Sequence, residues 1–374
     1  MSNLEHLAED SIPPYRLGFV MEHALGHVTI TQSLTRWLDE DPSVQPTWMQ
    51  VSSPANDIWE NIPAYALRMS LRARTRVRAA LQKEDLDCLL YHTHVTALFS
   101  LSLMERIPTV VSLDATPINF NTVGATYGYK AGNGLIEQLK FERYRKMFQS
   151  AAALIAWCNW AKESLVQDYG VAPDKVTVIR HGVDLSQWRP TVKEVGKDAP
   201  LRLLFIGGDF ERKGGNVLLE AFRQGLADRC TLDILTKDEM VRSEGPVRVH
   251  RGITPNSPLL RQFYAEADVF VFPTLGDIYA LVVIEAMASG LPIVATNVGA
   301  LAEAIEDGVT GLLVPPNDPD AIVKAICTLA DHPERLVAMR AAARARAEYL
   351  FDGKQNYKAL VDVLKRCVEE SRDP

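Results

Sequence analysis

The chain has 374 residues, of which 47% are hydrophobic and 23% are charged, as expected for a globular protein with about two domains. Its 40 Lys and Arg residues against 47 Asp and Glu give a net charge of −7, which argues against nucleic acid as a partner. The five cysteines lack metal-ligand spacing and indicate free thiols in a reducing compartment. No apolar run approaches the roughly 18 residues that span a bilayer. Segment 1–16 is too polar for a signal peptide, so we expect a cytoplasmic protein.

Short apolar runs alternate with helical patterns along the whole chain. Because these runs are continuously apolar, they are typical of strands buried on both faces of a parallel sheet. One series of predicted strands lies at 16–21, 47–53, 88–93, 109–114, 153–158 and 175–180, and a second at 202–207, 231–236, 247–252, 268–273, 292–297 and 311–316. Helical patterns such as 214–226 and 320–332 supply the crossovers. The sequence therefore predicts an α/β fold with two doubly wound parallel sheets.

The polar, proline-containing segment 186–202 separates the two series and is the natural linker. We expect an N-terminal domain over 1–188 and a C-terminal domain over 189–352, with the last helical pattern, within 353–374, packing back on the N-terminal domain. Ligands of such sheets bind beyond the carboxyl ends of the strands, and clefts between domains are favoured sites. The sequence leaves the oligomeric state open.

A glycine-rich turn follows the first strand of the second series. It runs from Gly208 through Arg212 and Lys213 to a second pair of glycines and then into a helix. Glycines allow a ligand close to the backbone, and a helix N-terminus beside two cations favours a pyrophosphate. The alternative is a solvated loop in which the glycines only form turns. The turn lacks both the Gly-Lys-Ser/Thr of a P-loop and the dinucleotide fingerprint, which removes the main support for hydride transfer.

Two acids, Asp277 and Glu285, stand eight residues apart in the apolar stretch 275–292. The helix of this stretch is predicted to begin near Leu281 or Val282, which puts Asp277 in the preceding loop and Glu285 in the first turns. Both carboxylates can then reach one ligand from different sides, and a carboxylate is a good acceptor for vicinal sugar hydroxyls. Alternatively, Glu285 complements the helix dipole and Asp277 caps a turn.

The order and spacing of these motifs resemble a known family. Asp277, seven residues, Glu285 and then Ala-Met-Ala-Ser-Gly, continued by 293–322 and preceded by 178–190 and 210–222, resemble the retaining glycosyltransferases of family 4. The resemblance is strong over about 150–350 and weak before it. It implies a GT-B fold, in which two Rossmann-like domains face one another across a cleft. It also implies transfer of a hexose from a UDP- or GDP-linked sugar to a hydroxyl of a small molecule, glycan or lipid, without a metal or other cofactor.

The resemblance assigns roles to residues of the C-terminal half. Glu285 would hold the ribose hydroxyls, and Asp277, in place of a more common Glu, would contact the transferred sugar. Lys213, with Arg212, would neutralise the diphosphate. The remaining predicted donor contacts are Gly26, Gly208, Gly252, Ile253, Ala280, Leu281 and Val282. Many relatives carry Gly-Phe-Gly where this chain has 278–280, so the donor sugar stays open.

Polar residues at the ends of the N-terminal strands are predicted to face the acceptor. They are Glu22, His27, His92 and Asp114. Relatives use a histidine in this region near the transferred sugar, for which His94 is the first choice and His92 the reserve. The alternative is that a histidine at a strand end is structural.

The helical pattern over Arg68–Lys83 is basic and is a candidate for contact with an anionic membrane surface. We favour a solvated outer helix, because large apolar residues are few on its basic face. Two alternatives for the whole chain remain, namely a non-catalytic subunit that binds a nucleotide sugar and an epimerase of the same fold. A phosphorylase would need a pyridoxal-binding lysine, which we do not identify.

Overall fold

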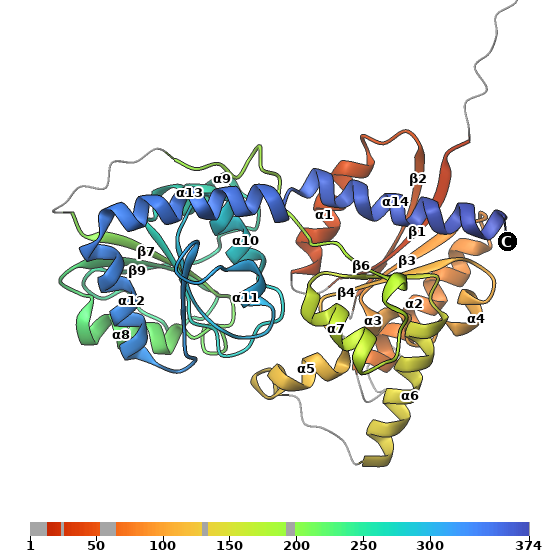
Figure 1. Ribbon diagram of the computed structural model, residues 1–374, viewed down its shortest axis with the longest axis horizontal. Helices are drawn as coiled ribbons and strands as arrows, with labels where there is room; N and C mark the ends of the chain where they lie inside the picture. Colours follow the sequence, from red (N-terminus) through yellow and green to blue (C-terminus); the bar gives the residue numbers. More distant parts are fainter. Residues whose placement is uncertain (1–12, 24–25, 53–64, 129–133, 192–198, 374) are drawn as a thin grey trace, which may run out of the picture.

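The computed structural model describes residues 13–23, 26–52, 65–128, 134–191 and 199–373. They form two six-stranded parallel sheets with helices on both faces (Figure 1). The first contains β1 (Tyr15–Glu22), β2 (Val44–Val51), β3 (Cys88–His92), β4 (Thr109–Leu113), β5 (Ala153–Ala156) and β6 (Val176–Val178). The second contains β7 (Leu201–Ile206), β8 (Cys230–Leu235), β9 (Val247–His250), β10 (Val269–Phe272), β11 (Ile293–Thr296) and β12 (Gly311–Val314). Every predicted run overlaps one of these strands, so the predicted α/β fold is confirmed.

Helices connect most pairs of consecutive strands, although the fully described segment between β8 and β9 contains none. The first half contains α1 (His27–Leu38), α2 (Tyr65–Leu81), α3 (His94–Ala97), α4 (Leu101–Met104), α5 (Pro117–Val123), the 3-10 turn η1 (Gly124–Tyr127), α6 (Gly134–Ser150), α7 (Asn159–Gln167) and η2 (Pro173–Lys175). The second contains α8 (Gly215–Gly225), α9 (Pro258–Glu266), α10 (Leu281–Ala288), α11 (Leu301–Ala304), α12 (Pro319–Asp331), α13 (Pro333–Leu350) and α14 (Gly353–Arg372). Each sheet separates two apolar clusters, as β1 illustrates by sending Phe19 to one face and Val20 to the other. Burial on both faces explains the continuously apolar strands.

The chain crosses between the two halves twice, and the two crossings pair with one another. Val183 N donates to Phe351 O at 3.0 Å, and Gly353 N donates to Val183 O at 3.0 Å. A Cβ on Gly182 would overlap the Phe351 carbonyl, so glycine permits this close approach. We call residues 182–184 and 351–353 the hinge.

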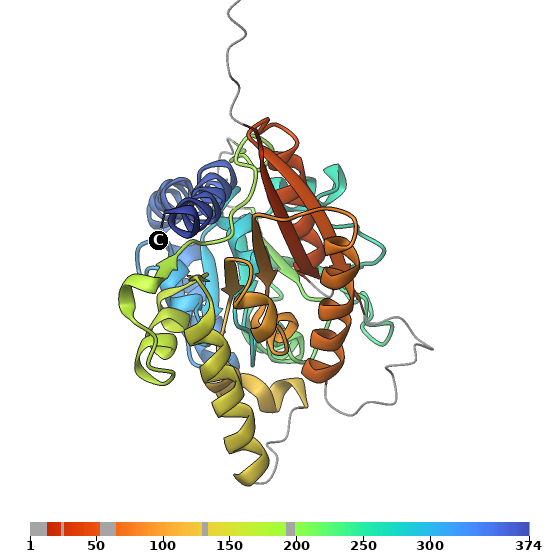
Figure 2. The ribbon, with the colours of Figure 1, turned by 90° about the vertical axis from the view of Figure 1, so that its right-hand side faces the viewer.

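After the second crossing, α14 lies over the first sheet, in line with α13 in Figure 1 and beside it, seen nearly end-on, in Figure 2. Its Tyr357 and Leu364 join the core around Phe19. Of the predicted linker, 192–198 lie outside the described residues, and Trp188 already packs against Tyr264 with ring centroids 5.2 Å apart. The exact domain boundary at 188/189 stays a prediction.

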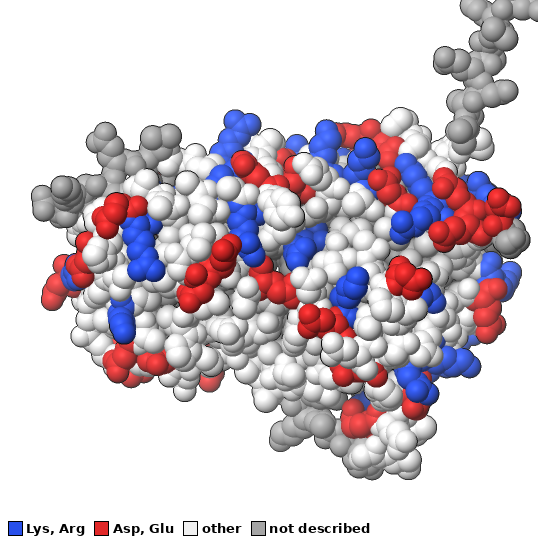
Figure 3. All heavy atoms as spheres, viewed as in Figure 1, with Lys and Arg blue, Asp and Glu red and all other residues white. Residues whose placement is uncertain are grey.

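Helix α2 contains most of the basic pattern proposed for a membrane surface. Its Met69, Ala73 and Val77 are buried in the first core, and Arg72 is 7% exposed with its guanidinium donating to Ser52 O at 3.1 Å. The face of the molecule in Figure 3 shows both signs of charge interspersed, with no large field of one sign. Among the described residues, no helix is both long and apolar enough to cross a bilayer. Residues 1–12, which contain most of the N-terminal segment judged above, lie outside the described residues.

Candidate active site

The order of the second sheet reverses between β7 and β10, and the loops after these two strands meet there. Gly214 has φ +80°, and a Cβ on it would overlap the carbonyl oxygen of Pro273. Glycine is therefore required for the turn before α8 to lie against the end of β10. This contact brings Lys213 to Asp277, and their side chains form an ion pair. Two residues predicted to bind donor thus meet at the switch point, where ligands of such sheets bind.

Arg212 lies in the same turn, and two of its guanidinium nitrogens donate to the protein. Its Nε donates to Asp209 Oδ2 at 2.9 Å, and its NH1 donates to Gly276 O at 2.8 Å. Its guanidinium also stacks on the ring of Tyr127, 4.2 Å from the centroid. Arg212 therefore ties the loop after β10 to the N-terminal half, and its contact with a diphosphate stays a prediction.

Glu285 lies inside α10, which begins at Leu281 as predicted. The side chain is 5% exposed, and Tyr264 Oη donates to its Oε2 at 2.8 Å. Burial raises the pKa of Glu285 to about 7, since desolvation disfavours the carboxylate and outweighs this hydrogen bond. Ala280 precedes the helix and supplies no side-chain cap, so the first N–H groups of α10 are available to a ligand.

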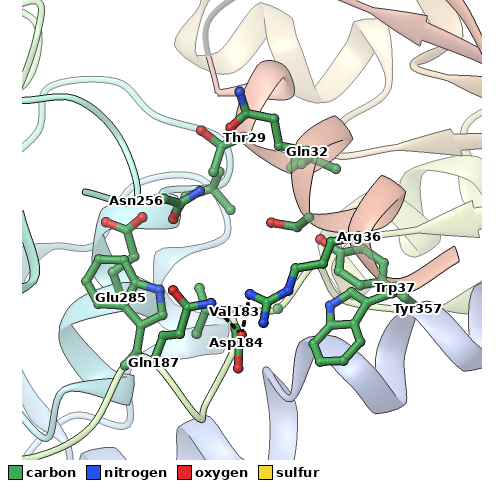
Figure 4. Close-up of a pocket in the computed structure, with 15 residues that line it drawn as sticks. Thr29, Gln32, Arg36, Trp37, Val183, Asp184, Gln187, Asn256, Glu285 and Tyr357 are labelled. Carbon is green, nitrogen blue, oxygen red and sulfur yellow. Dashed lines mark hydrogen bonds and ion pairs between the residues drawn. The ribbon is translucent and has the colours of Figure 1, made fainter. Parts of the chain in front are cut away.

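A cavity of about 190 Å³ lies beside Glu285, between the two halves (Figure 4). Leu281 and Asn256 line it from the C-terminal half, and α1 lines it from the other side. In Figure 4, Asp184 of the hinge joins Arg36 of α1 and Gln187, which donate to its Oδ2 at 2.8 and 2.7 Å.

The start of α1 faces the start of α10. A Cβ on Gly26 would lie 3.5 Å from Leu281 Cδ1, which is ordinary contact distance. Gly26, one of the predicted donor contacts, therefore lies across from the first N–H groups of α10.

Other predicted donor residues lie at the same carboxyl edge of the second sheet. Gly208 follows β7 and is exposed beside Lys237. Gly252 follows β9 with φ +70° and open space around its Cα, and Ile253 packs on the core under α10. Val282 offers its carbonyl to Tyr264 Oη at 3.2 Å.

The N-terminal half contributes a cluster of buried rings. His27 Nδ1 lies 3.1 Å from His92 Nε2, so the two imidazoles share a hydrogen bond. Trp157 stacks on His92 with centroids 5.1 Å apart, and His181 meets the edge of Trp157 at 4.1 Å. Burial and the neighbouring His27 lower the pKa of His92 well below its ordinary value, so His92 is neutral.

The two predicted acids of the N-terminal half are differently placed. Glu22 is 5% exposed and accepts hydrogen bonds from Tyr65 Oη at 2.6 Å and from the Thr93 hydroxyl. These partners occupy its carboxylate inside the domain. Burial raises the pKa of Asp114 to about 6, and the charge of His27 opposes that rise. Asp114 directly follows β4, at the same edge of the sheet as His92 at the end of β3.

The structure does not bring His94 to this pair. Strand β3 ends at His92, and Thr93 has φ +87°, which breaks the alternation that would have pointed both histidines to one side. The His94 ring packs against Tyr144 and Phe148, at 5.3 and 6.2 Å between centroids. His92, the reserve choice, is the histidine that meets His27.

Sequence analysis missed three residues of this region. Trp157 follows β5, His181 follows β6, and Tyr279 of the C-terminal half reaches both, donating from Oη to His181 O at 3.0 Å. The available signal was the place of His181 within 178–190, one of the segments that carry the family resemblance. Within the described ranges, no three His, Cys, Asp or Glu side chains are arranged to hold a metal ion.

Two family models match the chain, one in each half. The model described as Glycosyltransferase Family 4 matches residues 35–187, and that described as Glycosyl transferases group 1 matches 200–332. The chain belongs to the family 4, group 1 glycosyltransferases. The second match contains the Lys213 turn, Asp277 and Glu285.

Relatives of this chain agree with the family assignment. The D-inositol 3-phosphate glycosyltransferase 2 of Catenulispora acidiphila is 30% identical over 257 residues, which are 61% of this chain and 59% of that relative. The D-inositol 3-phosphate glycosyltransferase of Streptomyces scabiei is 32% identical over 231 residues, 54% of this chain and 51% of the relative. The matches thus span little more than half the length of these relatives.

Solved structures establish the fold of the chain as GT-B. A glycosyltransferase from Rickettsia africae superposes with a TM-score of 0.73 at 15% identity, covering 95% of this chain and 99% of that one. Sucrose-phosphate synthase from Thermosynechococcus elongatus gives 0.73 at 17% identity, covering 94% and 98%. HepE of Anabaena, crystallised with UDP-glucose, gives 0.68 at 16% identity, covering 94% and 99%.

Proposed function

We propose that this glycosyltransferase moves a hexose from a UDP- or GDP-linked sugar to a hydroxyl acceptor, with retention of the anomeric configuration. One observation carries the proposal: Asp277 and Glu285 flank the uncapped N-terminus of α10, with Lys213 paired to the first acid and a cavity beside the second. This arrangement offers N–H donors and a cation for a diphosphate, and carboxylates for sugar and ribose hydroxyls.

In the proposed donor complex, Glu285 accepts the ribose hydroxyls in the cavity, and the backbone of 280–282 donates to the diphosphate. The Lys213 ammonium exchanges Asp277 for a diphosphate oxygen, which frees Asp277 to accept from the sugar. Gly252 and Ile253 lie near the base, and Gly208 and Gly26 leave room on either side of the diphosphate. A divalent metal is not required in this scheme, because Lys213 and the N–H groups stabilise the leaving group.

The bond between the anomeric carbon and the diphosphate oxygen breaks, and a bond to the acceptor oxygen forms on the same face. The departing diphosphate oxygen takes the proton of the acceptor hydroxyl, so no protein base is needed. His27, held by His92, and Asp114 face the acceptor in this scheme. The protein contributes positioning and stabilisation of leaving-group charge.

The names of the relatives suggest the acceptor class. Two relatives with about 30% identity act, by name, on D-inositol 3-phosphate. We therefore propose a cyclic polyol or its phosphate as the first acceptor to test, with UDP-glucose, as found with HepE, as the first donor.

The test is to incubate the protein with UDP- and GDP-sugars and inositol phosphates, with EDTA present, and to measure released nucleotide and glycoside. Transfer with a retained anomeric configuration by NMR, lost in Glu285→Gln, is the expected result. Conversion of the donor without acceptor would instead indicate an epimerase. Donor binding without any turnover would indicate a non-catalytic subunit.

A further inference from the structure

The donor loop, residues 277–280, is held by both halves of the molecule. Within its own half, Ala300 N donates to Ile278 O at 3.2 Å. The loop is also bound to the other half, because Tyr279 Oη donates to the His181 carbonyl oxygen at 3.0 Å. The Tyr279 ring also meets Trp157 edge-on, with centroids 5.7 Å apart. The position of this loop therefore depends on where the N-terminal half lies.

The site that receives Tyr279 is built without it. Trp157 Nε1 donates to Ser112 Oγ at 2.7 Å, which fixes the indole over the end of β4. The His181 ring packs edge-on against that indole at 4.1 Å, and both side chains are buried. We call Trp157 and His181 the aromatic socket. Because its parts are held by N-terminal partners, it moves with that half as a unit.

The aromatic socket adjoins the hinge. His181 is followed directly by Gly182 and Val183, which pair with Phe351 and Gly353 of the second crossing. The backbone that must move when the angle between the halves changes is therefore close to the His181 carbonyl. The Tyr279 hydroxyl bonds to that carbonyl, so the donor loop is linked to the angle at the hinge.

We propose that Tyr279 is a positioning residue for sugar transfer, which sets Asp277 and the N-terminus of α10 through the His181 carbonyl. This inference rests on the proposed function. Asp277 precedes Tyr279 by two residues, and Ala280, the N-cap of α10, follows it, so a displaced Tyr279 displaces both. Glu285 is held separately by Tyr264, which belongs to the C-terminal half. Contacts to the transferred sugar and diphosphate thus depend on Tyr279, whereas contacts to the ribose do not.

The test is Tyr279→Phe, which keeps the ring and removes the hydroxyl. We expect kcat for transfer to fall about fivefold, the factor that corresponds to about 1 kcal/mol for one hydrogen bond. The Kd of the nucleoside, which has the ribose but no diphosphate, should change by less than about twofold, because Glu285 keeps its support. The matched control is Tyr349→Phe, since Tyr349 is 85% exposed on α13 and should change neither constant. An unchanged kcat, or a parallel loss of affinity for the nucleoside, would overturn the proposal.

A second readout separates this inference from the proposed function. Hydrogen–deuterium exchange at the amides of 278–282 should be faster in Tyr279→Phe than in the parent chain, and unchanged in Tyr349→Phe. If the parent chain transfers no sugar to any acceptor, the proposed function fails while faster exchange still supports the positioning role. Equal exchange in the two tyrosine variants would refute that role even in an active enzyme.

Discussion

Lys213 and Asp277 form an ion pair that joins the turn after β7 to the loop after β10. Their side chains are only 18% and 8% exposed, so removal of one partner leaves a charge with little water around it. We predict that Lys213→Met lowers the free energy of unfolding by about 3 kcal/mol, and that adding Asp277→Asn restores most of the loss. Urea unfolding of the ligand-free variants measures both effects.

Turnover should respond differently from stability in these variants. Because Lys213 is proposed to stabilise the departing diphosphate, its loss should reduce kcat by about a hundredfold or more in either background. A double variant that regains both stability and turnover would show that Lys213 only supports the fold.

Glu285 should make donor binding sensitive to pH. Burial raises its pKa from 4.5 to about 7. Between about pH 4.5 and about pH 7, Glu285 is therefore protonated in the folded chain and ionised in the unfolded chain. Stability should therefore fall as the pH rises from about 4.5 to about 7, while a nucleoside diphosphate should bind more tightly once Glu285 ionises near pH 7. Calorimetry from about pH 6 to about pH 8 measures the second effect.

The control for this prediction is Glu285→Gln, in which the nucleotide still titrates but residue 285 does not. Its affinity should be lower at the upper pH and should follow only the nucleotide's own ionisation. If the parent chain and the variant show the same pH profile, Glu285 does not contact the ligand.

His94 should weaken the fold in acid. Burial lowers its pKa to about 4, and its Nδ1 is buried without a partner. Below about pH 6.5 this histidine is protonated in the unfolded chain but stays neutral in the folded one. The free energy of unfolding therefore decreases as the pH falls toward about 4. We predict that His94→Phe, which suits the surrounding Tyr144 and Phe148, loses less Tm between about pH 7.5 and about pH 5 than the parent chain.

His332→Gln is the control. Because the His332 side chain is 57% exposed, its replacement should leave the decrease in Tm at acid pH unchanged. Turnover of His94→Phe decides its role in catalysis. A loss of about a hundredfold, with the fold intact, would place His94 at the sugar despite its aromatic surroundings.

Gly214 should tolerate no side chain. Its φ is +80°, and a Cβ would overlap the Pro273 carbonyl, so Gly214→Ala adds a backbone clash to conformational strain. We predict a loss of more than about 3 kcal/mol or failure to fold. Gly245→Ala is matched in conformation, with φ +56°, but meets open space and should cost about 1 kcal/mol. Similar unfolding midpoints in denaturant would contradict the close contact between α8 and β10.

The strands, the start of α10 and the donor-loop acids could be predicted from sequence, because each depends on residues close together in the chain. Apolar runs mark buried strands, and the 277–285 spacing puts one acid in a loop and the other in the helix that follows. The sequence predicted that Lys213 and Asp277 bind the same ligand, but it did not predict their direct contact. That contact requires the reversal of strand order between β7 and β10.

The remainder depends on contacts between distant segments or on single backbone angles. Tyr279 and His181 are 98 positions apart, and nothing in either local pattern predicts their hydrogen bond. The placement of His94 follows from one positive φ at Thr93, a value that a non-glycine residue rarely adopts and that sequence therefore does not suggest. Arg212 was expected to bind a ligand, but its partners Asp209, Gly276 and Tyr127 become visible only in three dimensions.

Helix α14 has a consequence for the order of folding. The first sheet is made early in synthesis, but the core on one of its faces includes Tyr357, Leu360 and Leu364, from the end of the chain. A nascent chain that has just emerged with β1–β6 complete therefore exposes this apolar face until the second sheet and α13 have also been made. The half synthesised later can complete its own core first, and the half synthesised earlier must wait for α14, which follows both sheets in the sequence.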